Sequence, residues 1–466
     1  MMQQQVDEHG LPVVDRLANF WAVPAARREA ILLEAIAATH TWHYARNRAY
    51  RQAVAARGVD AGVTPAPDVL ARLLRPTAQT FKSYIDVTGS SFPQDNPSSF
   101  VEWLDDQLSF DLTRERFASL RRRYRSLEAL LGAVEHTFAD LGLQMSTSSG
   151  TSGRSTIMVR DGDSTAKTVE SFYLAFLRYL GVEGVQRAVF VMPRHTRIAM
   201  ARMAAFSVQR LGLGDDRVHF AIPFPADPDK VRIRAGRTFR PGLSGLVERR
   251  LWHPFMGWMQ GRVVDPRAVR TTVDLLGRAE AGGERLLLFG GWVQLHAVAL
   301  ALREAGRRLR LAPGSLLGTG GGLKELYPCT PAEIRADLGQ VITLADGQPI
   351  PVRDVYGMAE GNWAAMQCSA GSYHVPPWIY ARTLDEDDGL QQAADSTGLL
   401  AFYDPYGGGR LFPAFFKTAD RVRLIHGNGS GDAAPCCLCG EPGTYILRDS
   451  IQRVDLLDEA GCAAQI

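Results

Sequence analysis

The segment "LLLFGGWVQLHAVALALREAG", residues 286–306, decides the fold class. Four apolar residues precede two glycines, and a helical pattern of apolar residues follows and ends at Gly306. This order is typical of a buried parallel strand that turns into a helix packed on the sheet. The segment has no charged group before Arg303, but its glycine pair, Gln294 and His296 favour a strand, a turn and a buried helix over a membrane span.

The same alternation of short apolar strands and helices recurs on both sides of this segment. Further examples are "RAVFVM" (187–192), "IAMARMAAFSVQRLG" (198–212), "RVHFAI" (217–222), "GSLLGTG" (314–320) and "IPVRDVYGM" (350–358). The pattern predicts an α/β fold with parallel βα units, in which ligands bind at the carboxyl ends of the strands.

Composition shifts along the chain predict four regions. Residues 1–140 read as a helical region leading into the core, with long helices over 26–58 and 120–142. Residues 141–396 form the α/β core, in which the Pro-, Arg- and aromatic-rich segment 223–262 looks like an insertion. Residues 397–452 read as a β-rich subdomain, and residues 453–466 as a hinge-like tail that contains Cys462.

Charge and cysteine content exclude several classes of protein. The 466 residues carry a net charge of +2 and no long basic block, which argues against nucleic acid as the main partner. The polar N-terminus lacks the pattern of a secretion signal, and no membrane partner is expected. Six cysteines, three of them crowded at 436–439, suit thiol or metal chemistry in a reducing compartment, so we expect a cytoplasmic protein.

One loop has the composition of an anion cradle. The sequence "SSGTSG" comprises Ser148, Ser149, Gly150, Thr151, Ser152 and Gly153. Its glycines permit positive φ, and its main-chain N–H groups and hydroxyls can converge on a triphosphate without a lysine. A plain Ser/Gly turn would have the same composition, so the loop alone leaves both interpretations open.

Two later stretches favour a nucleotide. The sequence "GTGGGL" (318–323) places Gly320, Gly321 and Gly322 after an apolar strand, where a flat ring can lie against bare backbone. The sequence "YGMAE" (356–360) offers the aromatic face of Tyr356 and, in Glu360, a hard oxygen ligand for Mg²⁺.

In this order the motifs resemble those of the adenylate-forming superfamily, and most closely its LuxE-like acyl-protein synthetases and phenylacetate-CoA-ligase-like members. The resemblance covers roughly residue 141 to the end. It implies the large core domain of these enzymes, with sheets flanked by helices, a small β-rich C-terminal part and no full lid domain. It also implies ATP and Mg²⁺ as cofactors.

The resemblance assigns a role to each motif residue. Residues 148–153 hold the phosphates, Gly320–Gly322 with Tyr356 and Gly357 face the adenine, and Glu360 binds Mg²⁺. Asp420, within "PAFFKTADRV", holds the ribose hydroxyls, and Arg453 begins the hinge-like segment. Cys462, within "EAGCAAQI", corresponds to the cysteine that accepts the acyl group as a thioester.

Two departures from the superfamily pattern bear on the second half of the reaction. Ala359 stands where the family usually has threonine, which removes one phosphate hydroxyl. The chain has no lysine after Lys417, so the lid lysine of conventional CoA ligases is missing from this sequence. A cycle that depends on lid rotation is therefore not expected, and a mobile Cys462 thiol would replace it.

The acid-binding residues are less sharply defined. Arg194, His195 and Trp292 lie where the superfamily builds its acid site, although Trp292 equally suits a core position. The aromatic residues Trp252, Phe255 and Trp258 suit either an apolar tunnel or core packing.

The remaining cysteines suggest a structural zinc site. Cys368 and His374 are six residues apart, and Cys437 and Cys439 are two apart, which gives a closed Cys₃His set if the two segments meet. Cys436 could replace Cys437, and the alternative is a group of reduced thiols.

We expect an ATP-dependent enzyme that activates a carboxylic acid as acyl-AMP and transfers the acyl group to a thiol, first to Cys462. An acyl-accepting reductase or carrier protein is the partner that this implies. A second hypothesis gives the acyl-AMP to an external amine, carrier thiol or other nucleophile of a natural-product pathway. A third is a non-catalytic nucleotide-binding subunit, which Ala359 would favour.

Overall fold

The computed structural model describes residues 5–7, 10–148, 155–323, 327–427 and 437–454. The chain divides into two compact units. Unit 1 consists of Met1–Ser146, Thr156–Ser171 and Glu360–Ala460, and unit 2 of Thr147–Ser155, Phe172–Ala359 and Gly461–Ile466. Each unit is therefore assembled from segments that are distant in sequence.

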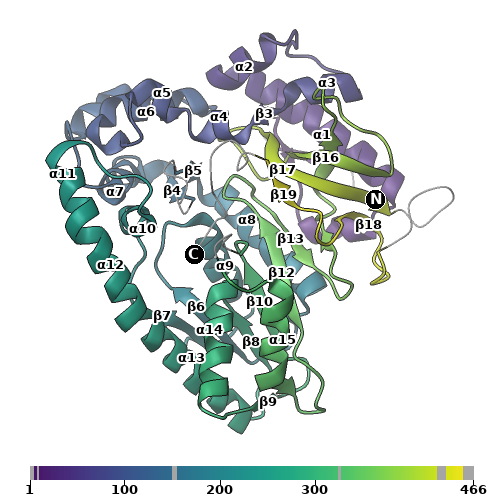
Figure 1. The fold of residues 1–466 in the computed structure, drawn as a ribbon. Helices are drawn as coiled ribbons and strands as arrows, with labels where there is room; N and C mark the ends of the chain where they lie inside the picture. The colour runs from purple at the N-terminus through teal and green to yellow at the C-terminus, as the bar shows by residue number, and fades with distance from the viewer. Residues whose placement is uncertain (1–4, 8–9, 149–154, 324–326, 428–436, 455–466) are drawn as a thin grey trace. The chain divides into compact units, whose positions relative to one another are not determined.

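Unit 2 contains the parallel sheet that the sequence predicts, with its strands in the order β12-β10-β8-β6-β7 (Figure 1). All four neighbouring pairs are parallel. The strands are β6 (Arg187–Pro193), β7 (Val218–Ile222), β8 (Leu286–Phe289), β10 (Leu316–Gly320) and β12 (Val352–Gly357). The helices between them are α9 (Ala199–Gln209), α13 (Asp265–Ala281), α14 (Trp292–Glu304) and α15 (Pro331–Val341), and a short parallel pair joins β9 (Leu309–Leu311) to β11 (Ile342–Leu344). The α/β prediction is confirmed.

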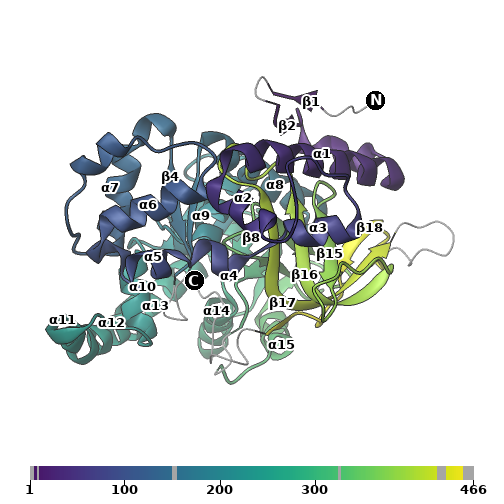
Figure 2. The same cartoon turned by 90° about the horizontal axis from the view of Figure 1, so that it is seen from above.

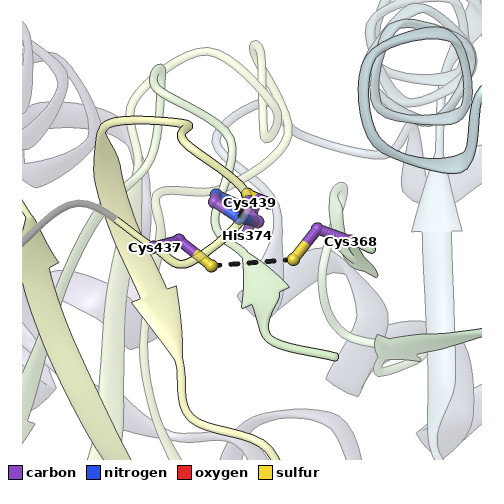
Figure 3. Close-up of side chains that lie close together, drawn as sticks. All are labelled: Cys368, His374, Cys437 and Cys439. Carbon is purple, nitrogen blue, oxygen red and sulfur yellow. Dashed lines mark hydrogen bonds between the residues drawn. The ribbon is translucent and has the colours of Figure 1, made fainter. Parts of the chain in front are cut away.

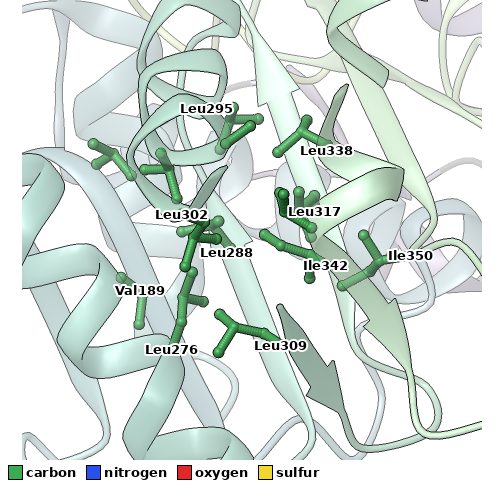
Figure 4. Packing of buried hydrophobic residues seen from close by; sticks show 14 of the residues in the cluster. Val189, Leu276, Leu288, Leu295, Leu302, Leu309, Leu317, Leu338, Ile342 and Ile350 are labelled. Atoms are coloured by element: carbon green, nitrogen blue, oxygen red, sulfur yellow. The ribbon is translucent and has the colours of Figure 1, made fainter. Parts of the chain in front are cut away.

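The core of unit 2 lies between this sheet and helices α13, α14 and α15. Figure 4 shows leucines of β8 and β10 packed against Leu276, Leu295 and Leu338 of these helices. The turn between β8 and α14 favours glycine, because a Cβ on Gly290 would lie 3.1 Å from the Cβ of Val191 and strands β8 and β6 would have to move apart slightly. The opening segment of the sequence therefore folds as predicted.

The segment 223–262 is helical. It forms α10 (Pro228–Ala235), α11 (Gly242–Val247) and α12 (His253–Met259), and π-helical turns follow α11 and α12. Trp252, Phe255 and Trp258 are about half exposed. These three side chains therefore do not form the packed core that the sequence left open as one alternative.

Unit 1 contains an antiparallel sheet with its strands in the order β15-β16-β17-β18-β14-β13. The strands are β13 (Ala364–Gln367), β14 (Tyr373–His374), β15 (Tyr380–Leu384), β16 (Asp395–Asp404), β17 (Ala414–Gly427) and β18 (Gly443–Ile446). The long strand β17 also pairs with β3 (Arg75–Pro76) and with β19 (Gln452–Arg453). Strand β17 therefore joins the N-terminal and C-terminal parts of unit 1.

The N-terminal helices pack beside strands β15 and β16 (Figure 2). The hydroxyl of Tyr403 in β16 donates to the main-chain oxygen of Leu70, and Arg382 in β15 pairs with Glu29. The helices of unit 1 are α1 (Ala25–Arg46), α2 (Arg48–Ala55), α3 (Pro67–Leu73), α4 (Thr77–Phe81), α5 (Tyr84–Thr88), α6 (Pro97–Gln107) and α7 (Leu127–Thr137), and α8 (Gly162–Ala175) begins in it. Two short pairs complete the fold, β1 (Gln5–Val6) with β2 (Pro12–Val13) and β4 (Gln144–Thr147) with β5 (Ile157–Arg160).

Two predicted helices are shorter than expected. The helix expected over 26–58 breaks at Asn47, whose side chain accepts a hydrogen bond from the N–H of Tyr50 and caps α2. The helix expected over 120–142 begins only after Ser126, whose hydroxyl caps α7 through the N–H of Ala129. Among the described residues, no helix is both long and apolar enough to cross a bilayer.

Candidate active site and metal centre

The glycine-rich segment of unit 2 lies at the carboxyl end of β10. Gly320 pairs with Val355 of the neighbouring strand β12, so the adjacent Tyr356 and Gly357 end β12 at the same edge of the sheet. Gly321 and Gly322 have φ values of 85° and 68°, which favour glycine. The structure therefore brings together the residues predicted to face an adenine.

The same strand carries a buried hydroxyl that lacks a protein partner. The Oγ1 atom of Thr319 is buried and has no hydrogen-bond partner among the described residues. A buried hydroxyl without a partner is costly in free energy, and such groups in native structures call for a water, an ion or a ligand. This atom lies one residue before Gly320 and is a polar group that the sequence did not single out.

The predicted acid-binding residues follow two neighbouring strands. Arg194 and His195 follow β6 and line a cavity of about 390 Å³, and the Arg194 guanidinium pairs with Asp215 at 3.4 Å. Trp292 begins α14, is only 2% exposed, and belongs to the apolar core of unit 2. The Trp292 ring also faces the guanidinium of Arg335, 4.8 Å from its centroid.

A second cavity of unit 2, of about 250 Å³, lies between the ends of β6 and β7 and the helices α10 and α12. Its apolar side chains include Ile198, Phe255 and Met259. Two basic residues, Lys230 and Arg234, also line it, and the Arg234 guanidinium donates to Gln260 Oε1 at 3.0 Å. Burial lowers the pKa of Arg234. The Lys230 ammonium pairs with Asp227 at 2.7 Å. An apolar cavity that also holds the Arg234 guanidinium suits an apolar acid.

Glu360 begins the last segment of unit 1 and is held by a neighbouring hydroxyl. Thr156 Oγ1 donates to Glu360 Oε1 at 2.7 Å. Two residues further along, Asn362 accepts from Arg160 Nε at 2.9 Å and donates to the main-chain oxygen of Gly407 at 2.8 Å. These contacts fix the backbone on the C-terminal side of Glu360.

The turn that contains Gly407 depends on a buried carboxylate. Asp404, at the end of β16, accepts from the N–H groups of Tyr406 and Gly407. Burial raises the pKa of Asp404 to about 6, although those N–H groups and the charge of Lys167 act in the opposite direction. The sequence pattern did not identify Thr156 or Asn362, because their contacts join residues that are far apart in the chain. It also did not identify Asp404, because the burial of this carboxylate depends on the tertiary fold.

Asp420 and Arg453 lie opposite each other. They are paired residues of the antiparallel strands β17 and β19. The N–H of Asp420 donates to Thr418 Oγ1, whose hydroxyl also donates to the main-chain oxygen of Leu400. The structure therefore brings together these two predicted site residues. Of the predicted phosphate loop only Ser148 is described, since Ser149, Gly150, Thr151, Ser152 and Gly153 lie outside the described residues, as does Cys462.

The predicted metal ligands meet in unit 1 (Figure 3). One ligand atom each of Cys368, His374, Cys437 and Cys439 lies within 4.8 Å of all the others. The Sγ atoms of Cys368 and Cys437 are 3.6 Å apart, and Cys439 Sγ lies 3.3 Å from His374 Nε2. Cys368, His374 and Cys437 are at most 3% exposed. The two segments that carry the predicted ligands therefore meet, as the predicted zinc site requires.

Parts of this chain are similar in sequence to known ligases. Residues 264–466 match the family model described as acyl-protein synthetase, LuxE. A long-chain-fatty-acid–luciferin-component ligase of Vibrio harveyi is 24% identical over 41% of this chain, and one of Aliivibrio fischeri is 33% identical over 31% of it. The matched segments span 47% and 35% of those two proteins, so this chain covers less than half of each relative.

The fold is that of a solved acyl-CoA ligase. An open conformation of 2-hydroxyisobutyryl-CoA ligase in complex with 2-HIB-AMP and CoA matches 97% of this chain and 81% of its own, with a TM-score of 0.55 and 14% identity. The same ligase in the thioesterification state gives the same TM-score over 74% of its chain. The predicted fold of the adenylate-forming enzymes is confirmed.

Proposed function

From the premise that residues 264–466 are related to the LuxE acyl-protein synthetases and that the chain has the fold of an adenylate-forming ligase, we propose that this protein activates a carboxylic acid with ATP. The acid's carboxylate oxygen attacks the α-phosphorus of ATP, the bond to the β-phosphate oxygen breaks, and acyl-AMP and pyrophosphate form. The observation that carries this proposal is the meeting of Gly320 and Tyr356 at one edge of the parallel sheet.

The nucleotide-binding roles in this proposal follow the motifs. Gly320, Gly321 and Gly322 leave room for a flat ring, and Tyr356 offers a stacking face. The buried Thr319 hydroxyl, which has no hydrogen-bond partner among the described residues, supports the binding of a polar ligand near β10. Residues 148–153 would hold the phosphates, and Asp420 the ribose hydroxyls.

Glu360 is the proposed ligand of Mg²⁺. Its carboxylate is a hard oxygen donor, and the hydrogen bond from Thr156 fixes one of its two oxygens. When bound, Mg²⁺ supplies positive charge that offsets the repulsion between the acid and the phosphates. Thr156 and Asn362 act as positioning residues, because they hold Glu360 and the backbone that follows it.

The proposed substrate class is an apolar acid of limited size. The cavity at the ends of β6 and β7 measures about 250 Å³, below the roughly 300–1,000 Å³ typical of ligand pockets. Its Phe255, Met256 and Met259 suit an apolar tail, and the Arg234 guanidinium suits a carboxylate, whereas Lys230 is paired with Asp227 at 2.7 Å. A short acyl chain or a single aromatic ring therefore suits this cavity better than a long fatty acid.

The second step transfers the acyl group to a thiol. In the proposal the Cys462 thiolate attacks the acyl carbon of acyl-AMP, a thioester forms, and AMP leaves. A reductase or a carrier protein would then take the acyl group from the thioester. None of the described cysteines forms a disulfide, which supports a reducing compartment such as the cytoplasm for this chemistry.

Acid-dependent exchange of labelled pyrophosphate into ATP tests the first step. We expect exchange with short apolar acids and little with long-chain ones. Exchange with none of a broad panel of acids would contradict adenylation and favour a non-catalytic nucleotide-binding subunit.

Intact-mass analysis tests the second step. After incubation with ATP and the preferred acid, we expect the mass of one acyl group on the protein, removable by hydroxylamine. The adduct should disappear in Cys462→Ser and persist in Cys329→Ser, a matched thiol replacement in unit 2, while both variants keep pyrophosphate exchange. Full turnover to an external acceptor in Cys462→Ser would remove the thioester from the mechanism.

A further inference from the structure

We propose that Cys368, His374, Cys437 and Cys439 bind one Zn²⁺ ion in a closed structural site of unit 1. This inference goes beyond the proposed adenylation and does not depend on it. It rests on the distances between the four ligand atoms, on their burial, and on the backbone conformation that presents them.

Two of the separations between the four ligand atoms are close to those of tetrahedral zinc, and all four atoms lie within 4.8 Å of one another. With Zn–S bonds of about 2.3 Å and Zn–N bonds of about 2.0–2.1 Å, two sulfurs lie about 3.8 Å apart, and a sulfur and a nitrogen about 3.6 Å apart. The observed separations are 3.6 Å between Cys368 and Cys437 and 3.3 Å between Cys439 and His374. A disulfide would require about 2.05 Å between the two sulfurs, so Cys368 and Cys437 do not form a disulfide.

Two matching turns present the thiols. In residues 368–372 the N–H of the fourth residue, Gly371, donates to the Cys368 oxygen at 3.0 Å, and the N–H of Cys368 donates to the Ser372 oxygen at 2.9 Å. In residues 437–441 Gly440 donates to Cys437 at 2.7 Å, and the N–H of Cys437 donates to Glu441.

The two glycines have the same backbone conformation, with φ of 86° in Gly371 and in Gly440. The two turns therefore have the same geometry, although they are 69 residues apart in the chain. The first residue of each turn is a cysteine, and the sulfur atoms of these two cysteines face each other. Thiols that merely pack together in a core do not need two turns of the same geometry, whereas ligands of a metal ion do need a defined orientation.

The chemistry of the four donors favours zinc. Three sulfurs and one imidazole form a soft donor set, which suits Zn²⁺ better than Mg²⁺ or Ca²⁺. All four positions of a tetrahedron are taken by protein, and three of the residues are almost fully buried, so no position remains for a substrate. On binding at neutral pH, the three thiols lose their protons to solvent and zinc–sulfur bonds form.

The ion would fasten one end of the antiparallel sheet. His374 in β14 pairs with Tyr445 in β18, and β18 pairs with β17. Cys437 and Cys439 lie in the turn that leads into β18. Bound zinc therefore joins this turn to the β13–β14 turn and closes a loop of about 70 residues, which stabilises the folded chain.

Metal analysis of the full-length protein, purified from zinc-supplemented cells without chelators, tests the proposal. We expect one zinc per chain. Removal of the ion by a chelator should lower the midpoint of thermal unfolding by about 5 °C or more, and added Zn²⁺, but not Mg²⁺, should restore it. Cobalt reconstitution of the same protein should give the absorption of sulfur-to-metal charge transfer.

Three variants locate the ion. Cys368→Ser and Cys437→Ser should lose the zinc, whereas Cys329→Ser, outside the cluster, should keep it. Cys436→Ser should also keep the zinc, because the structure places Cys437 at the cluster. Pyrophosphate exchange measures adenylation independently of these outcomes.

Two results would overturn the site. One is a folded wild-type protein that neither contains zinc nor binds added Zn²⁺. The other is zinc retained in full by both Cys368→Ser and Cys437→Ser. The zinc content of the wild-type protein tests the proposal even if a serine variant fails to fold.

Discussion

Asp404 shows how a single buried carboxylate supports the candidate site. It accepts two main-chain N–H groups of the turn 405–407, and Asn362 donates to the oxygen of Gly407 in that turn. Asn362 lies two residues after Glu360. In the proposed site Asp404 would therefore be a positioning residue, since its contacts reach Glu360 through the turn and Asn362.

The raised pKa of Asp404 predicts a pH-dependent stability. The folded chain holds this proton up to about pH 6, whereas the unfolded chain releases it near pH 4. The folded state therefore binds more protons between these values, and its stability falls as the pH rises from about 4 to 6. Asp404→Asn removes the titration, keeps an oxygen acceptor for the two N–H groups, and should gain up to about 3 kcal/mol relative to wild type between pH 4 and pH 7.

Urea unfolding of both proteins at a series of pH values measures this difference. Asp15→Asn, at an exposed position, provides the control and should show no comparable change. A constant difference between Asp404→Asn and wild type across pH 4–7 would mean that the carboxylate keeps an ordinary pKa.

At the scale of elements, strand β10 depends on close approach to its neighbour. A Cβ on Gly318 would lie 2.5 Å from the Phe289 ring of β8, closer than carbon atoms pack. Gly318→Ala should therefore cost about 1–3 kcal/mol of unfolding free energy and weaken pyrophosphate exchange, because β10 leads directly into Gly320.

Gly257→Ala is the matched substitution for this test. Gly257 lies in helix α12, and its added Cβ would meet nothing within 4 Å. It should be neutral or stabilise the protein by up to about 1 kcal/mol. Equal denaturation midpoints for the two alanine variants would contradict the packing argument.

The sequence predicted the βα units well, because apolar runs such as Leu286–Phe289 and glycine turns such as Gly290–Gly291 are local signals. It did not predict the break at Asn47, since the apolar spacing continues in phase through it and the cap is a side-chain contact. The hydrogen bond between Thr156 and Glu360 joins residues 204 positions apart, and no periodic pattern carries such information.

Among the candidate site residues, the cysteines and the histidine are the easiest to predict from sequence, because few other roles require several of these residues at short spacing. The short spacings of Cys368 to His374 and of Cys437 to Cys439 predict the cluster that the structure brings together. The sequence leaves Trp292 ambiguous because a large side chain after a strand-to-helix turn can lie in the core or in a ligand site, and here the ring is buried.

At the scale of the whole molecule, ligand binding should appear as thermal stabilisation. A nucleotide that binds only the folded chain adds about 2.7 kcal/mol at one hundred times its dissociation constant. Saturating ATP with Mg²⁺ should therefore raise the unfolding midpoint by about 2–5 °C. Asp420→Ala should abolish most of the shift, because the proposal assigns Asp420 to the ribose.

Differential scanning fluorimetry measures the shift, and Asp15→Ala, exposed and outside the motifs, should respond like wild type. A shift of equal size in Asp420→Ala would exclude that residue from nucleotide binding. If pyrophosphate raises the unfolding midpoint and AMP does not, the protein recognises only the phosphate groups of the nucleotide.

The division of unit 1 into separated segments has a consequence for biosynthesis. On the edge opposite β16, strand β17 pairs with residues 75–76 at Phe416 and Lys417 and with residues 452–453 at Asp420 and Arg421. At roughly 5–20 residues per second, a ribosome takes on the order of 20–80 s to proceed from the first of these to the second. The contacts of β3 and α4 with β17 therefore form only after most of the polypeptide has been translated, which makes this region a natural client for chaperones that bind nascent chains.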